Sequence, residues 1–198
     1  MRIDPDYGPF AAAAPGHEAD LAALFANDDD ELWLVEAEAV APPPGTVVRK
    51  TARLAQMVAT GPVVRPAGSF CVRLGGQDHR EMAALAHATQ PGPWRPFTAY
   101  YGSFYGQIRD GRLIAMAGER LRPAPGMIEV SAVCTDPAWR GQGLAAQLIC
   151  QVMSEHRDHG ASSFLHSYAE NAGAIALYRK LGFELRCERV VTILGKAN

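Results

Sequence analysis

The sequence predicts an α/β fold of the α+β type, in which a mixed, mostly antiparallel sheet carries helices on both faces. Residues 103–109, 113–121 and 128–135 indicate three consecutive strands joined by short breaks, which favours antiparallel pairing. Apolar residues recur at helical spacing over residues 144–153, and Gly160 is a typical helix stop. Because this helix separates strand 128–135 from a further strand at residues 162–168, we expect these two strands to be parallel.

The 198 residues divide into two expected parts. Residues 67–198 hold the sheet described above, and residues 1–66 are expected to add a small N-terminal αβ elaboration. The elaboration combines a loose Pro/Ala/Gly-rich start, a helical turn and two strands, at residues 1–16, 21–25, 32–37 and 46–58. Prolines and glycines between Gly61 and Gly68 mark the expected boundary.

The remaining elements lie on either side of the three-strand stretch. Asp78 and Glu81 have the spacing of a capping box and predict the start of a helix. The aromatic loop 92–101 follows, and it indicates either one wall of a substrate site or an apolar cap on the sheet. Asn171 predicts the N-cap of a last helix, and residues 184–194 predict a last strand, continuous or broken by a bulge.

Composition and charge exclude several classes of protein. Hydrophobic residues make up 48% and charged residues 20%, a balance that is typical of a folded globular chain. With 19 basic and 21 acidic residues, the net charge of −2 predicts no general affinity for nucleic acid or an anionic membrane. No apolar run could span a bilayer and the first residues lack the apolar core of a signal peptide, so a cytoplasmic location is expected. Four cysteines without CxxC spacing predict free thiols.

The segment from Asp136 to Ala145 carries the clearest chemical signal. A strand leads into a glycine-containing loop that begins a helix, so free N–H groups and the positive end of the helix dipole face the strand end. Gly141 and Gly143 let a phosphate approach the backbone, and Arg140 adds a positive charge. A tight turn without a ligand would need the same glycines, but the combination favours a pyrophosphate site. A Rossmann domain would need more parallel strands than the chain offers, and no P-loop motif occurs.

The same segment resembles the signature of the GNAT superfamily of N-acetyltransferases. That signature is an Arg or Gln, two free positions, a Gly, one free position and a Gly or Ala, and residues 140–145 match it. The later segment NAGAIALYRKLGF, residues 171–183, also resembles the family, whose order of elements is followed over residues 70–195. The FR47-like branch of the superfamily is the most similar.

This resemblance implies that acetyl-coenzyme A binds in a V-shaped opening between a splayed pair of parallel strands, 128–135 and 162–168. Backbone groups near Val133 would pair with the pantetheine arm, and an unpaired N–H there would polarise the thioester carbonyl. No metal is implied. The implied cofactor-binding residues are Val133, Cys134, Thr135, Arg140, Gly141, Gln142, Gly143, Leu144, Ala145, Asn171 and Tyr178.

Two residues are candidates for the proton transfers of acetyl transfer to an amine. Tyr178 matches the position from which the family often protonates the coenzyme A sulfur, although a core tyrosine would have the same spacing. Glu129 either accepts the amine proton or is a solvated carboxylate at the exposed start of a strand. Strand alternation favours Cys134 as a small core residue rather than a nucleophile, which favours direct transfer. The sequence does not decide whether His166 faces the acceptor.

The expected function is therefore the acetyl-coenzyme A dependent acetylation of a primary amine by direct transfer. A non-catalytic acyl-coenzyme A binding module with a regulatory role and a nucleotide-binding protein are the alternatives. The acceptor stays open among a small amine, an amino acid and a peptide amine, and the resemblance leaves a homodimer open. His156 and His159 fall on the last turn of their helix, where the dipole favours a cation, so they do not indicate a metal site.

Overall fold

A computed structural model describes residues 1–62 and 71–197 of the chain, so most of the expected boundary at 61–68 lies outside the described residues. Eight strands form one sheet in the order β1-β8-β2-β7-β6-β5-β4-β3. Only β6 and β7 pair in parallel among the strand pairs described. The strands are β1 (Glu31–Glu36), β2 (Thr46–Ala59), β3 (Val72–Arg73), β4 (Phe104–Arg109), β5 (Arg112–Glu119), β6 (Met127–Thr135), β7 (Ser162–Tyr168) and β8 (Phe183–Lys196). The structure confirms the predicted mixed, mostly antiparallel sheet with its parallel pair.

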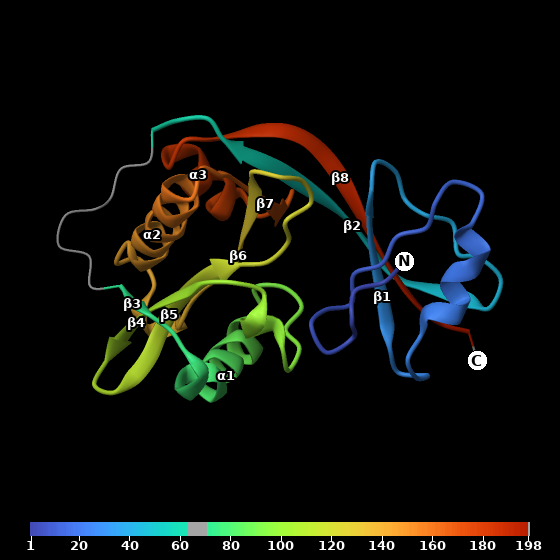
Figure 1. The fold of residues 1–198 in the computed structure, drawn as a ribbon, viewed down its shortest axis with the longest axis horizontal. Coiled ribbons are helices and arrows are strands. Elements are labelled where there is room, and N and C mark those ends of the chain that lie inside the picture. The colour runs from blue at the N-terminus through green and yellow to red at the C-terminus, as the bar shows by residue number, and fades with distance from the viewer. Residues whose placement is uncertain (63–70, 198) are drawn as a thin grey trace.

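Helices cover both faces of the sheet (Figure 1). On one face lie α2 (Leu144–Asp158) and α3 (Ala172–Lys180), whose apolar residues share a core with inward-facing residues of β2, β5, β6 and β7. On the other face, α1 (His79–Thr89) packs on β5 and β6 through a second core that contains Met82, Met116 and Cys134. The two rows of apolar residues in α2 predicted this burial, and Leu148 and Ile149 are fully buried.

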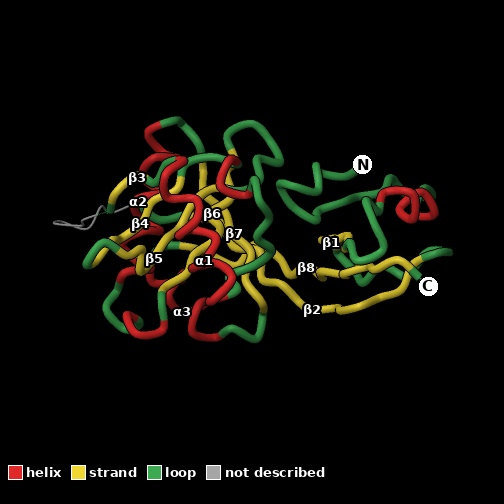
Figure 2. The backbone as a smooth tube through the Cα atoms, turned by 90° about the horizontal axis from the view of Figure 1, so that it is seen from below, coloured by secondary structure: helices red, strands yellow, loops and turns green. Residues whose placement is uncertain are grey.

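The strands β2 and β8 are unusually long and join two ends of the molecule. Each has 14 residues, and together they extend away from the helix-covered core (Figure 2). At the far end, β1 pairs with β8, and the short 3₁₀ helix η1 (Glu18–Leu24) covers β1 through Leu21, which packs with Leu32, Leu34 and Leu194. The sheet is therefore continuous across the two expected parts of the chain, since β2 lies between β7 and β8.

The N-terminal segment is fixed rather than loose, contrary to the expectation from its composition. Residues 6–11, which we name the N-terminal strap, connect β1 to the aromatic loop 92–101. The Phe97 N–H donates to the carbonyl of Asp6, and the Trp33 N–H donates to the carbonyl of Pro9, at 2.8 Å each. Backbone hydrogen bonds to partners far along the sequence thus order a segment whose own residues have little tendency to form regular structure.

One local prediction is wrong, and one alternative for the last strand is confirmed. The capping box at the start of α1 does not form, because the 3₁₀ turn η2 (Gly76–Asp78) precedes the helix and gives Asp78 helical angles. The Glu81 carboxylate instead accepts a hydrogen bond from the Leu113 N–H at 2.8 Å, which ties α1 to β5. The last strand is continuous, with an irregularity in its register against β2 near Arg186. Among the helices described, none is long and apolar enough to cross a membrane.

Candidate active site

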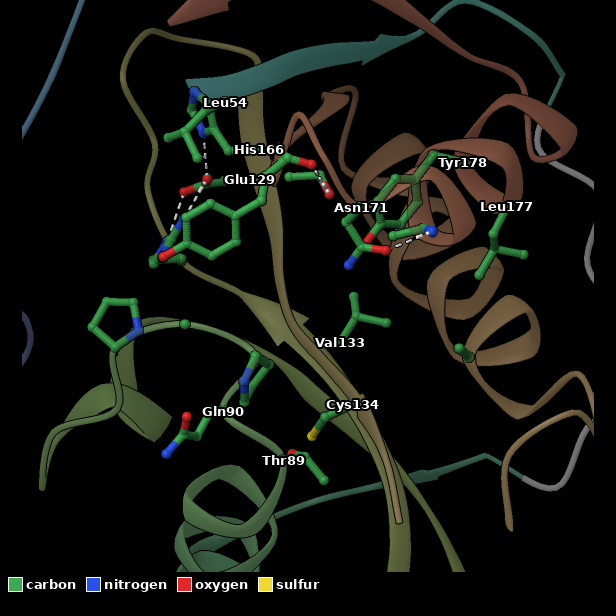
Figure 3. A pocket seen from close by; sticks show the side chains of 18 of the residues that line it. Leu54, Thr89, Gln90, Glu129, Val133, Cys134, His166, Asn171, Leu177 and Tyr178 are labelled. Carbon is green, nitrogen blue, oxygen red and sulfur yellow. Dashed lines mark hydrogen bonds and ion pairs between the residues drawn. The ribbon is translucent and has the colours of Figure 1, made fainter. Parts of the chain in front are cut away.

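A cavity of about 960 Å³ runs through the middle of the molecule. One end is lined by the loop before α2 and by the start of that helix, and the other end by the N-terminal strap, β1 and β8. Between them the cavity passes Val133 of β6, Asn171 before α3 and Tyr178 of α3 (Figure 3). The cavity therefore connects the expected phosphate site to the part of the protein that residues 1–62 build.

The centre of the cavity is the V-shaped opening expected between the parallel strands. Pairing of β6 with β7 covers only Met127–Glu129 against Ser162–Phe164, although both strands continue beyond it. The register of β6 against β5 also shifts by one residue near Ala132, whose φ of +51° is rare for a residue with a side chain. This bulge turns the course of β6 at the point where the strands separate, and Val133 points into the cavity (Figure 3).

The loop before α2 has the features of an anion site. Gly141 and Gly143 have φ of +79° and +74°, and the space where a Cβ would stand is open at both. Gly143 is the N-cap of α2, so no side chain satisfies the first N–H groups of this 15-residue helix. Arg140 is exposed, and it forms no ion pair within the described parts of the chain. Gln142, also expected to bind the cofactor, is exposed and does not line the cavity.

Most other residues expected at the cofactor line the cavity. Thr135, Leu144 and Ala145 line the end near α2, and Cys134 lines it near the end of α1. The Asn171 side-chain oxygen accepts a hydrogen bond from the Ala174 N–H at 3.1 Å, which confirms that it caps α3.

Tyr178 is a core residue that also lines the cavity. Its side chain belongs to the core above the sheet and is 9% exposed, and it packs edge-on against Phe183. Its ring nevertheless lines the cavity, across from Val133 (Figure 3). Burial raises the pKa of the Tyr178 hydroxyl, which therefore stays protonated at neutral pH.

Glu129 is fully buried, so the expectation of a solvated carboxylate at an exposed strand start is wrong. Its two oxygens accept hydrogen bonds from the Arg120 guanidinium at 2.7 and 2.9 Å. The Nδ1 atom of His166 lies 2.8 Å from the same carboxylate. Burial alone would raise the pKa of this carboxyl, but the charge of Arg120 and the hydrogen bonds from His166 and Arg120 lower it to about 2. An ionised carboxylate with so low a pKa is a weak base at neutral pH.

His166 is the residue that sequence analysis left undecided, and it lines the cavity beside Glu129 (Figure 3). Its Nε2 atom lies 2.9 Å from the Gln56 side-chain nitrogen, while the Gln56 oxygen accepts from Arg186. These contacts fit a neutral imidazole with the proton on Nδ1 and a lone pair on Nε2. The predicted parallel pairing of 128–135 with 162–168 was the one signal that could have placed His166 near Glu129. In the parallel register Glu129 lies beside Phe164, two residues before His166.

His156 and His159, near the end of α2, lie apart from the cavity lining. His156 is fully buried, with Nδ1 2.8 Å from the Ser163 hydroxyl and Nε2 3.4 Å from the Glu119 carboxylate. His159 is exposed and contacts the carbonyl of Glu155. No cluster of three or more metal-ligating side chains occurs in the described residues.

Comparisons with known proteins agree with this geometry. The model of the acetyltransferase (GNAT) family matches residues 74–183. N-alpha-acetyltransferase RimI of Mycobacterium tuberculosis is 31% identical over 100 residues, which cover 46% of this chain and 62% of that protein. The match thus spans less than two thirds of the length of this curated relative.

Two solved structures extend the comparison. A GNAT-family protein from Novosphingobium aromaticivorans is 57% identical, with a TM-score of 0.96 over 100% of this chain and 88% of that chain. The ribosomal-protein-S18-alanine N-acetyltransferase of Escherichia coli shares the fold, with 20% identity and a TM-score of 0.53 over 64% of this chain and 92% of its own. The FR47-like branch stays a prediction, since these comparisons do not test the branch. The chain belongs to the GNAT acetyltransferase family and is an acyltransferase.

Proposed function

We propose that the protein transfers the acetyl group of acetyl-coenzyme A directly to a primary amine. The observation that carries this proposal is the V-shaped opening between β6 and β7, with an uncapped helix N-terminus at one end and the Glu129–His166 pair beside it. Acetyl-coenzyme A would supply the acetyl group as a thioester. Every other role in the reaction falls to residues of this chain.

Residues at the α2 end fit the pyrophosphate. The N–H groups at the start of α2 have no capping side chain, and Arg140 is free to pair with an anion within the described structure. Beyond Glu129, β6 has backbone groups that face the opening without pairing to β7, and an amide-bearing arm can satisfy them. A backbone N–H near Val133 would stabilise negative charge that develops on the thioester oxygen.

His166 and Tyr178 supply the two proton transfers. The amine nitrogen forms the new C–N bond while the C–S bond breaks, and the nitrogen loses one proton to Nε2 of His166 after the Gln56 N–H has moved away. Glu129 holds the Nδ1 proton of that imidazole and stabilises the imidazolium cation. Tyr178 donates its hydroxyl proton to the departing sulfur. Glu129 is thus a positioning residue, and His166 takes over the base role first assigned to Glu129.

Calorimetry with acetyl-coenzyme A and a thiol-release assay over a panel of primary amines test the proposal together. Binding followed by amine-dependent thiol release is the expected result. Binding without thiol release for any amine would instead support a non-catalytic regulatory module. Competition by ADP as strong as competition by coenzyme A would support a nucleotide-binding protein.

Three further predictions from the sequence accompany this proposal. The protein is expected to act in the cytoplasm, as a monomer or a homodimer, without nucleic acid or membrane as a partner. Residues 1–66 are proposed as an elaboration of the acetyltransferase domain 67–198, and the residues of this segment that line the cavity support a role at the acceptor end.

A further inference from the structure

The end of the cavity beyond the V-shaped opening is apolar. Its lining includes five apolar residues from four separate segments of the chain: Phe10, Trp33, Val35, Leu54 and Val191. Val191 is 1% exposed and Leu54 8%, and both belong to an apolar cluster with Trp33 and Val35 on one face of the sheet. Leu54 and Val191 lie in the long strands β2 and β8, Trp33 and Val35 lie in β1, and Phe10 lies in the N-terminal strap. All five lie outside residues 74–183, the stretch that the GNAT family model matches.

The charged groups near this end are already paired or point elsewhere. Arg120 is neutralised by Glu129 and lies against the ring of Phe10, with 4.7 Å from the guanidinium carbon to the ring centre. Glu36 also lines the cavity, but strand alternation in β1 directs its side chain to the face opposite Val35. Among the described residues that line this end, the charged side chains are therefore Arg120, which is paired, and Glu36, which lies on the other face of β1 from Val35.

The N-terminal strap bounds the same end. It is hydrogen-bonded to the loop 92–101 through Asp6 and to β1 through Pro9, and it presents Phe10 to the cavity. Rings of Phe10 and Trp33 pack edge to face, with centres 6.3 Å apart. An apolar substituent of a small acceptor can pack against these two rings.

We infer that the acceptor is a small primary amine with an apolar substituent, such as an alkylamine or an arylalkylamine. This inference rests on the proposed acetyl transfer. The amine group lies toward His166 and Glu129, and the substituent is buried against Trp33, Val35 and Val191. Removing an apolar chain of several carbons from water stabilises a complex, so such amines gain an advantage that hydroxylated or charged amines of the same length lack.

The test compares kcat/KM for hexylamine and phenethylamine with that for ethanolamine, glycine, spermidine and a tetrapeptide with a free N-terminus. We expect the two apolar amines to exceed each of the others by about 10-fold or more. In Trp33→Ala this preference is expected to shrink about 10-fold while the Kd for acetyl-coenzyme A is unchanged. Leu185→Ala, which alters an exposed side chain of β8 away from the cavity lining, is the matched control and keeps the preference.

The outcomes separate this inference from the function on which it rests. A preference for the peptide, for spermidine or for glycine would overturn the inference and leave acetyl transfer intact. If no amine is acetylated, the proposed function fails, and the acceptor class is then decided by calorimetric titration of the same amines into the protein saturated with coenzyme A. Tighter binding of hexylamine than of ethanolamine would support the apolar site, and equal or weaker binding would overturn it.

Discussion

Two glutamate–histidine pairs involve glutamates of the neighbouring strands β5 and β6, and only one of the pairs reaches the cavity. Glu129 of β6 contacts His166, and both line the cavity. Glu119 of β5, whose strand neighbour is Val130 of β6, lies 3.4 Å from His156 and is absent from the lining of that cavity. Each glutamate is buried and also binds an arginine, so the two pairs have the same chemical composition.

The two pairs differ in access to the cavity rather than in residue type. His156 has no exposed surface and its Nδ1 atom is engaged by Ser163, so a substrate has no path to it. His166 is 13% exposed and its Nε2 atom is held by a side-chain amide, which can move. We therefore assign a structural role to the Glu119–His156 pair and a role in proton transfer to the Glu129–His166 pair.

Matched substitutions at His166 and His156 are expected to give the largest difference between the two pairs. His166→Gln removes the proton acceptor, so kcat/KM for a primary amine is expected to fall by about 10²–10⁴-fold. His156→Gln is expected to keep kcat/KM within a few-fold and to lower the free energy of unfolding by about 1–3 kcal/mol, because buried hydrogen-bonding groups lose a partner. Steady-state kinetics and urea unfolding measure the two effects. Equal losses of activity would contradict the assignment.

Substitution of either glutamate leaves an arginine without its counter-ion, and the two arginines differ in exposure to water. Glu129→Gln leaves the buried Arg120 without its counter-ion, so the free energy of unfolding at pH 7 is expected to fall by about 3–5 kcal/mol. Glu119→Gln is expected to cost less, because the Arg122 side chain is 58% exposed and water can solvate it. Urea unfolding of both variants at pH 7 gives this difference directly.

The same variants test a dependence on pH. Despite burial, contacts with Arg120 and His166 lower the pKa of Glu129 to about 2, and contacts with His156 and Arg122 lower that of Glu119 to about 2, from 4.5. Both carboxylates thus stabilise the fold fully above about pH 4.5, and this stabilisation is lost as the pH falls from 4.5 toward 2. Glu129→Gln is expected to flatten the loss of stability over that range. A pH profile parallel to that of the unsubstituted protein would contradict the lowered pKa.

A similar pair of substitutions, at Tyr178 and Tyr105, tests the proposed proton transfer to the leaving sulfur. Tyr178→Phe removes the proton donor at the cavity, so kcat is expected to fall by about 10–100-fold while the Kd for acetyl-coenzyme A is unchanged. Tyr105→Phe is the matched control, since the Tyr105 hydroxyl donates to Glu155 and does not line the cavity. Thiol release and calorimetry separate the two parameters. An unchanged kcat for Tyr178→Phe would remove Tyr178 as the acid.

Local signals in the sequence predicted the elements that position the site. The periodicity of residues 144–153, the capping Asn171 and the loop 140–145 each depend on neighbours in sequence, and the structure confirms the helices and the uncapped loop. Antiparallel pairing of β4, β5 and β6 likewise followed from their short connections.

The burial of Glu129 could not be predicted in the same way. Its partners Arg120 and His166 come from outside its own strand, so its environment depends on the register of three strands. The ordered strap was missed for a similar reason, because its hydrogen bonds reach Trp33 and Phe97, far along the chain. Composition describes what a segment prefers when isolated and does not report which distant groups will bind it.

Cys134 provides the smallest expected effect and the sharpest contrast with His166. Burial raises the pKa of this thiol to about 11, so only about one thiol in 10⁴ is ionised at pH 7, and its side chain belongs to the core beneath α1. Cys134→Ala is therefore expected to change kcat/KM by less than about 2-fold, with Cys187→Ala, outside the cavity lining, as the control. Mass spectrometry after incubation with acetyl-coenzyme A alone should find no acetylated Cys134. An acetyl group on that sulfur, together with loss of activity in Cys134→Ala, would replace direct transfer by a covalent route and leave His166 to deprotonate the thiol rather than the amine.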